Sequence, residues 1–172
     1  IWIIQQHDLE NNAFNMPDLI PLIPTGGETL DENAVRRAVH LLALKHEALR
    51  TGFKEIDGHA VQYVLTDFEI PFEIEDLTGL SPAEKQQRLA GLIDCFHTRP
   101  FRLDEPPLFR MLIVKLEPGY WIMAYNMHHI VSDGWSLEIL KRDFPEIYQS
   151  VRSGGDMEEQ IVNNLPELTY KD

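Results

Sequence analysis

The sequence predicts an α/β fold of the α+β kind, a two-layer sandwich in which a mixed, largely antiparallel sheet carries helices on one face. Two observations lead to this prediction. Strand-like segments are paired across very short turns, at Asp57-Gly58 and at Glu117-Pro118-Gly119, as is typical of antiparallel neighbours. Around these pairs lie amphipathic segments that open with helix-capping residues, and such helices bury their apolar face against a sheet.

The first helix is expected to begin near Asp31 and to end near Leu49. Thr29 and Glu32 form a T-x-x-E capping box, although Asp31 could be the cap instead. Apolar residues recur along this segment at helical spacing. His46 falls on the apolar stripe, which predicts a core histidine.

Strands are expected in both halves of the chain. Asp57-Gly58 is a strong hairpin signal between residues 52–56 and 59–66. A short extended stretch should follow at 70–75. The longest strands are expected at 108–116 and 120–127, as an antiparallel pair that ends at two histidines.

Two further helices are expected from their boundary residues. The segment Ser81-Pro82-Ala83-Glu84 is a capping box with proline at the first helical position, and Arg99-Pro100 should end that helix. The last helix should begin near Gly134 and be kinked or interrupted at Pro145. From Gly154-Gly155 onward the sequence is expected to form a polar tail.

The charge balance restricts the classes of partner. The chain carries 15 Lys and Arg against 28 Asp and Glu, a net charge of −13, which disfavours nucleic acid and anionic membranes. The opening IWIIQQ has no basic segment and no cleavage site, so it is not a signal peptide, and we expect that the chain is entered in the middle of an element. The single cysteine, Cys95, fits a reducing cytoplasm, and we expect a buried structural thiol.

The stretch MHHIVSDGWS, residues 127–136, carries the chemistry. Neighbouring strand residues point to opposite faces, so we expect one of His128 and His129 in a cleft and the other buried. Asp133 should fix the loop by bonding backbone amides or by pairing with an arginine, and Gly134 permits a tight backbone path. Adjacent strand histidines are poor joint metal ligands, so no metal site is predicted. On the residues alone, a structural histidine pair is as plausible as an active site.

Several blocks in order resemble a known family. HHIVSDG fits the H-H-x-x-x-D-G motif of the chloramphenicol-acetyltransferase-like acyltransferases, and MHHIVSDGWS resembles its version in condensation domains of nonribosomal peptide synthetases. Residues 45–53, KHEALRTGF, resemble that family's R-H-E-x-L-R-T-x-F block. Residues 99–103 with 107–110, and the opening 1–6, resemble further blocks. The chain is therefore identified as a member of the condensation-domain family. The resemblance implies that residues 1–172 form the N-terminal lobe, with a chloramphenicol-acetyltransferase-like fold, and that the second lobe is absent from this chain.

The resemblance implies roles for individual residues. His129 would be catalytic in joining a donor acyl or peptidyl thioester to an acceptor aminoacyl thioester, and His128 would be structural. Asp133 would hold the loop through an ion pair, and Gly134 would line the cleft. For Arg50, a structural ion pair beneath the site and a solvated position at the helix end are equally expected. Trp135 and Ser136 would lie at the cleft.

The resemblance also implies partners and leaves alternatives open. No cofactor would bind directly, because both substrates ride on phosphopantetheine arms of donor and acceptor peptidyl carrier domains. The C-terminal lobe of the same domain and an adjacent adenylation domain would be further partners. The alternatives are a related H-H-x-x-x-D-G acyltransferase, an epimerisation domain, and a noncatalytic docking lobe.

Overall fold

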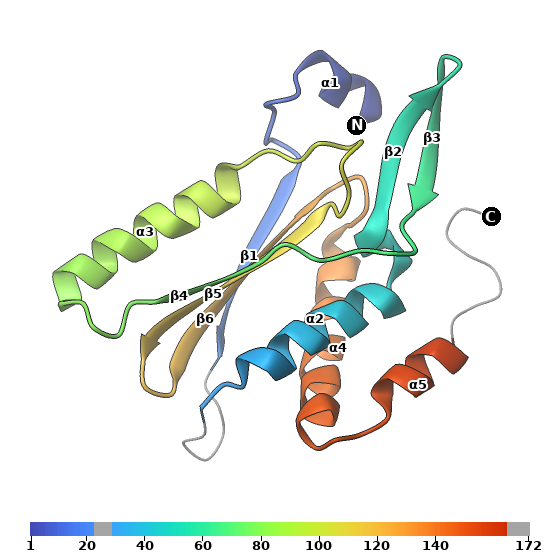
Figure 1. Cartoon of the computed structure of the whole chain (residues 1–172). Coiled ribbons are helices and arrows are strands. Elements are labelled where there is room, and N and C mark those ends of the chain that lie inside the picture. The colour runs from blue at the N-terminus through green and yellow to red at the C-terminus, as the bar shows by residue number, and fades with distance from the viewer. Residues whose placement is uncertain (23–28, 165–172) are drawn as a thin grey trace.

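The computed structural model describes residues 1–22 and 29–164 of the chain, and its centre is a four-stranded sheet (Figure 1). The strand order is β1-β6-β5-β4, in which β4 runs parallel to β5 and the other pairs are antiparallel. A separate hairpin, β2-β3, lies beside it. The strands are β1 (Asn15–Leu22), β2 (Thr51–Ile56), β3 (His59–Val64), β4 (Phe72–Asp76), β5 (Phe109–Glu117) and β6 (Tyr120–His128). The predicted mixed, largely antiparallel sheet is confirmed.

The helices lie between and after the strands. They are α1 (Trp2–His7), α2 (Glu32–Lys45), the short 3-10 helix η2 (Glu47–Arg50), α3 (Pro82–Thr98), α4 (Gly134–Arg152) and α5 (Met157–Asn163). The structure confirms the alternative cap of α2, Asp31, in place of the Thr29–Glu32 capping box, and it confirms the capping box of α3. Asp31 caps α2 by accepting a hydrogen bond from the Ala34 amide, and Ser81 and Glu84 form the expected capping box of α3.

Helices cover both faces of the sheet, so the expectation of helices on one face was wrong. Along β5, Met111 and Ile113 pack in the same core cluster as α2 and α4, whereas Leu112 and Val114 pack with α3. Alternate strand residues point to opposite faces, so α3 lies across the sheet from α2 and α4, as Figure 1 shows. The apolar faces of α2, α3 and α4 are each buried on the sheet as their periodicity indicated.

Three local expectations need correction: the end of α2, the interruption of α4 at Pro145 and the burial of Cys95. Helix α2 ends at Lys45 and not near Leu49, because His46 adopts an extended conformation and a 3-10 turn follows. Helix α4 continues through Pro145 without interruption. Cys95 is also exposed and not buried, because it lies on the outer side of α3.

Three elements of the fold, helix α1, strand β1 and helix α5, were not predicted. Strand β1 contains Pro17 and Pro21, residues that normally argue against a strand, but β1 is an edge strand of the sheet, where proline is tolerated. Helix α5 forms where a polar tail was expected. Ile161 is buried against the core, and Glu158 forms an ion pair with Arg37 of α2.

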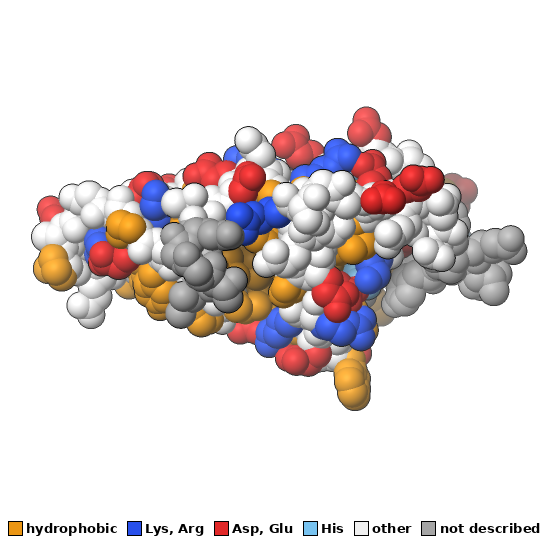
Figure 2. Space-filling view, turned by 90° about the horizontal axis from the view of Figure 1, so that it is seen from below, with side chains coloured by type: hydrophobic (Ala, Val, Ile, Leu, Met, Phe, Trp, Pro, Cys, Tyr) orange, Lys and Arg blue, Asp and Glu red, His pale blue; other side chains and the backbone are white. Residues whose placement is uncertain are grey.

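The surface carries both hydrophobic and charged side chains. Figure 2 shows hydrophobic side chains gathered on the underside of the molecule, among charged side chains of both signs. No helix within the described residues is both long enough and apolar enough to cross a membrane.

Candidate functional site

His128 is the last residue of β6 and is completely buried. Its ring packs between Phe14 and Phe101, with centroid distances of 5.9 and 6.2 Å. Its Nδ1 accepts a hydrogen bond from the Ile130 amide at 3.1 Å, so the ring proton resides on Nε2, which faces Gln5 Oε1 at 3.4 Å. Burial, reinforced by the nearby His129, lowers the pKa of His128 to about 4. His128 is therefore a neutral, structural imidazole near neutral pH.

His129 is exposed, as strand alternation predicted for one member of the pair. Its backbone amide donates to the Phe14 carbonyl at 2.8 Å, which fixes the start of the turn after β6. Its Nδ1 lies 2.7 Å from the Ser132 carbonyl, and a carbonyl can only accept, so Nδ1 carries the proton. Nε2 then holds the lone pair of the neutral ring, and no hydrogen bond to it is found within residues 1–22 and 29–164.

The turn that carries His129 is held at its far end by Ser132. The Ser132 hydroxyl donates to the His128 carbonyl at 3.1 Å, and the Val131 amide donates to the same carbonyl at 3.1 Å. Both residues are buried. The imidazole of His129 is thus presented on a short, internally bonded turn and not on a loose loop.

Asp133 caps the helix that follows this turn. Its Oδ1 accepts from the Ser136 amide at 2.9 Å and from the Ser136 hydroxyl at 2.8 Å, and the Ser136 hydroxyl in turn accepts from the Asp133 amide. The bonds from the Ser136 amide and hydroxyl lower the pKa of Asp133. Among the described residues Asp133 forms no ion pair, so the expected ion pair is replaced by the backbone bonding that the sequence also allowed.

The first residues of α4 leave space beside the turn. A Cβ placed on Gly134 would meet no atom within 4 Å, and Gly134 does not need a positive φ, so its backbone there is unstrained. The open space beside Gly134 is compatible with the close approach of a substrate that was expected there. The Trp135 side chain is 78% exposed, and Ser136 is half-buried.

Arg50 is buried, and its partners are structural. It donates to the carbonyls of Ala43 at 3.2 Å and of Leu65 at 2.6 Å, and it pairs with Glu47 at 3.2 Å. These contacts tie the end of α2 to the segment after β3. The structural ion pair is present, but its partner is Glu47 of the same 3-10 helix and not a residue of the histidine turn.

His46 belongs to a network that the sequence did not reveal. It is half-buried and not a core histidine, and its Nε2 lies 2.8 Å from the buried carboxylate of Asp143 on α4. Asp143 also pairs with Lys45 and Arg142, each at 2.8 Å, and these hydrogen bonds outweigh burial and lower its pKa to about 2. Helical spacing placed Asp143 on α4 but carried no sign of partners from α2.

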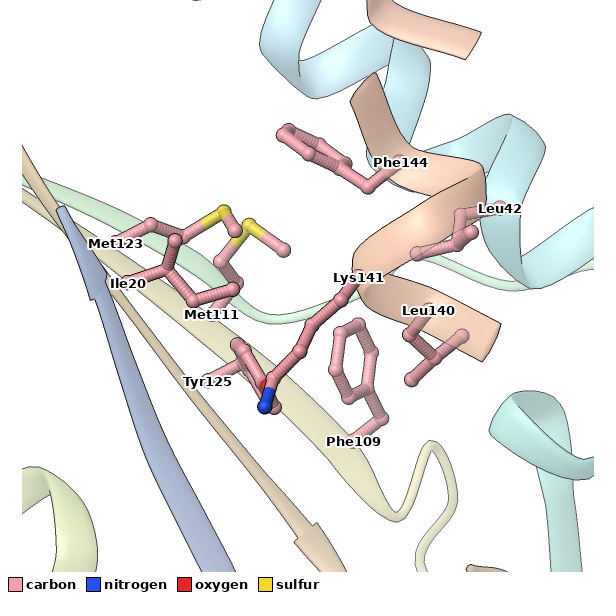
Figure 3. A pocket seen from close by; sticks show the side chains of 9 residues that line it. All are labelled: Ile20, Leu42, Phe109, Met111, Met123, Tyr125, Leu140, Lys141 and Phe144. Atoms are coloured by element: carbon pink, nitrogen blue, oxygen red, sulfur yellow. The ribbon is translucent and has the colours of Figure 1, made fainter. Parts of the chain in front are cut away.

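A narrow apolar cavity lies between α4 and the sheet (Figure 3). Its volume is about 10 Å³, room for one water. Lys141 crosses it toward β1, where its Nζ pairs with Asp18 at 2.8 Å and Tyr125 donates to the same carboxylate. The cavity is lined by Ile20, Leu42, Phe109, Met111, Met123, Tyr125, Leu140, Lys141 and Phe144. None of these residues belongs to the histidine turn, so the candidate site is the exposed turn and not this cavity.

No cluster of three or more His, Cys, Asp or Glu side chains suited to hold a metal ion occurs in the part of the chain that the structure describes. The turn presents an exposed imidazole, that of His129, whose Nε2 has no hydrogen-bond partner within the described residues. An unprotonated imidazole nitrogen can accept a proton or a hydrogen bond.

A family model described as the condensation domain matches residues 1–172. The chain belongs to the condensation domain family. This condensation-domain chain is 35% identical over 154 residues to a linear gramicidin synthase of Brevibacillus parabrevis, covering 90% of the chain and 3% of that protein. It is 34% identical over 172 residues to surfactin synthase subunit 2 of Bacillus subtilis, covering 100% of the chain and 4% of that protein. The chain thus spans a few per cent of the length of these relatives.

Solved condensation domains share the fold of this chain. The starter condensation domain of rhizomide synthetase superposes with a TM-score of 0.78 at 21% identity, over 90% of this chain and 37% of that one. The first condensation domain of the calcium-dependent antibiotic synthetase gives a TM-score of 0.79 at 22% identity, over 91% of this chain and 36% of that one. The predicted family and the predicted chloramphenicol-acetyltransferase-like fold class are therefore confirmed.

Proposed function

We propose that this chain is the N-terminal lobe of a two-lobed condensation domain, which forms peptide bonds in nonribosomal peptide synthesis. The observation that carries the proposal is the exposed His129 imidazole, whose Nδ1 is bonded to the Ser132 carbonyl while Nε2 has no partner in the described part of the chain. The relatives, which are peptide synthetases of far greater length, support the same reaction.

In this reaction the amine of an acceptor aminoacyl group attacks the thioester carbonyl of a donor acyl or peptidyl group. The C–N bond forms, the C–S bond breaks, and the sulfur leaves as a thiolate. His129 Nε2 removes the amine proton, which finally reaches the thiolate, or it positions the amine by accepting a hydrogen bond. Most of the rate gain comes from holding the two tethered reactants together, because aminolysis of a thioester is intrinsically feasible.

The neighbouring residues support His129 in this proposal. His128 is structural, and Asp133 holds the turn through the cap of α4. Gly134 lines the cleft near the donor acyl group, which is supported by the open space beside its Cα. Trp135 and Ser136 line the same cleft, and Arg50 supports the scaffold from the end of α2.

The substrates arrive on other domains in this proposal. Donor and acceptor are carried on phosphopantetheine arms of two peptidyl carrier domains, and no cofactor binds to the lobe itself. The C-terminal lobe completes the cleft, and an adenylation domain is an adjacent partner. A cytoplasmic location, expected from the single cysteine, belongs to the same proposal.

Substitution of His129 tests the proposal in a two-lobed protein, in which a second condensation-domain lobe follows this chain. Dipeptide formation from loaded carrier domains should fall by about 100- to 10,000-fold in His129→Ala, the range for loss of a general base. His59→Ala is the matched control, because His59 is exposed on β3, and its rate should not change. A His129→Ala protein with the wild-type rate would refute the proposed role. Carrier binding without any dipeptide from the unsubstituted protein would favour a noncatalytic docking lobe.

A further inference from the structure

Gln5 is a buried polar residue far from the histidines in sequence. Its side chain is on α1 and only 1% exposed. A buried amide is costly unless its donor and acceptor groups are both satisfied. The partners of Gln5 therefore indicate why a glutamine is placed there.

The two donor contacts of Gln5 determine how its amide is oriented. Nε2 donates to the Asn11 carbonyl at 3.0 Å and to the Phe101 carbonyl at 3.5 Å. Both partners are carbonyl oxygens and can only accept, so the NH₂ group must face them. The oxygen of the amide, Oε1, consequently faces His128 Nε2 at 3.4 Å.

The opposite side of the His128 ring is fixed by the backbone. The Ile130 amide donates to His128 Nδ1 at 3.1 Å, so Nδ1 must carry the lone pair. A neutral imidazole with its lone pair on Nδ1 has its proton on Nε2, the atom that faces the Gln5 oxygen. The hydrogen-bonded series therefore runs from Gln5 through the His128 ring to the amide of Ile130, next to His129.

We propose that Gln5 is a positioning residue for His129, because it holds His128 as the Nε2–H tautomer that can accept from the Ile130 amide and so fixes the turn. With the other tautomer, His128 Nδ1 and the Ile130 amide would both present hydrogens, and the turn would lose this bond. The inference rests on the proposed function of His129. The Phe14 and Phe101 rings lie beside His128, with centroid distances of 5.9 and 6.2 Å, and the two ring nitrogens of His128 face the Gln5 oxygen and the Ile130 amide.

Three variants separate the hydrogen bond from packing. Gln5→Leu keeps the approximate size of the side chain but removes the acceptor. Gln5→Glu keeps an oxygen that can face His128 Nε2, but it also replaces the NH₂ group that donates to the Asn11 and Phe101 carbonyls. Gln6→Leu is the matched control, since Gln6 is the next residue on α1 and is exposed.

The first readout is spectroscopic and needs no activity. Nitrogen-15 shifts of the imidazole in the 172-residue chain should show His128 protonated on Nε2 in the wild type, in Gln5→Glu and in Gln6→Leu. In Gln5→Leu a mixture of tautomers should appear, and hydrogen exchange of the Ile130 amide should be about tenfold faster, as expected for loss of one buried hydrogen bond. A wild-type His128 protonated on Nδ1, or a Gln5→Leu spectrum unchanged at His128, would overturn the inference without touching the role of His129.

The second readout is catalytic, in the two-lobed protein. Gln5→Leu should lower kcat for dipeptide formation about tenfold and leave KM for the loaded carriers within about twofold, and Gln5→Glu should restore most of kcat. An altered tautomer with unchanged kcat would overturn the positioning role. If instead His129→Ala were fully active, the proposed function would fail while the tautomer result for Gln5 stood. Should Gln5→Leu not fold, the tautomers of the wild type and of Gln5→Glu still decide the question.

Discussion

At the scale of single residues, the two adjacent histidines differ in what surrounds them. The His128 ring fills a space between Phe14 and Phe101, and its Nδ1 satisfies a backbone amide. The His129 ring is exposed, and within the described residues its one hydrogen bond is to the Ser132 carbonyl. Stability and activity should therefore separate between them.

Alanine substitutions should show this separation. His128→Ala should lower the free energy of unfolding by about 2–4 kcal/mol, because it leaves a cavity and an unsatisfied Ile130 amide. His129→Ala should change it by no more than about 1 kcal/mol. Urea unfolding of the two variants measures both values. The reverse order of destabilisation would show that the structural and exposed roles are assigned to the wrong histidines.

The pH dependence of stability should also report on His128. Its folded-state pKa of about 4 lies below the ordinary value of 6.5, so between these pH values the unfolded chain binds more protons. The free energy of unfolding should therefore rise from about pH 4 to about pH 6.5. Above about pH 6.5 the contribution of His128 should be fully present and amount to up to about 3 kcal/mol. Burial also lowers the pKa of His46 and of His97, so the contribution of His128 is isolated by comparison with a variant.

Unfolding free energies of wild type and His128→Leu, measured from pH 4 to pH 7, provide that comparison. The variant lacks the titrating imidazole, and its stability should depend less steeply on pH than that of the wild type. Equal slopes for the two proteins would contradict a buried, neutral His128.

At the scale of elements, the start of α4 depends on Asp133. Asparagine can keep the acceptor for the Ser136 amide, whereas alanine cannot. Asp133→Asn should therefore lower the melting temperature and the rate of dipeptide formation less than Asp133→Ala, with a small residual loss because the charge also favours the helix N-terminus. Equal and complete loss of activity in both variants, with unchanged melting, would indicate direct proton transfer by Asp133.

Local signals predicted most elements, and long-range contacts explain the exceptions. The Asp57-Gly58 turn has φ values of 53° and 77°, the left-handed conformation that its two-residue hairpin requires. The Ser81 capping box and the start of α4 at Gly134 were equally local. The face chosen by α3, the end of α2 at Lys45 and the exposure of Cys95 depend on packing between distant segments, which periodicity does not encode.

In the candidate site, too, local features were predictable from the sequence and long-range partners were not. Strand alternation predicted one buried and one exposed histidine, and the structure confirms that division. The partner that fixes the buried one, Gln5, lies 123 positions earlier in the chain. No spacing within the motif could indicate this contact. The network of Asp143 was not predicted for the same reason, because its partners Lys45 and His46 lie at the end of α2, far from Asp143 in the sequence.

At the scale of the whole molecule, we propose that this chain supplies one side of a cleft that needs a second lobe. His129 lies on an exposed turn, and the apolar cavity beneath α4 is separate from it. A single open surface cannot hold a donor and an acceptor, each tethered to its own carrier, within attacking distance. Catalysis should therefore require both lobes, although the histidine turn is already formed in one.

The most direct measurement is dipeptide formation by the 172-residue chain alone, incubated with donor- and acceptor-loaded carrier domains and followed by mass spectrometry. The two-lobed protein under the same conditions is the positive control, and its His129→Ala variant is the negative control. We expect multiple turnovers from the two-lobed protein, and none above the negative control from the chain alone. Multiple turnovers by the chain alone would contradict the claim, because they would show that one lobe holds both substrates.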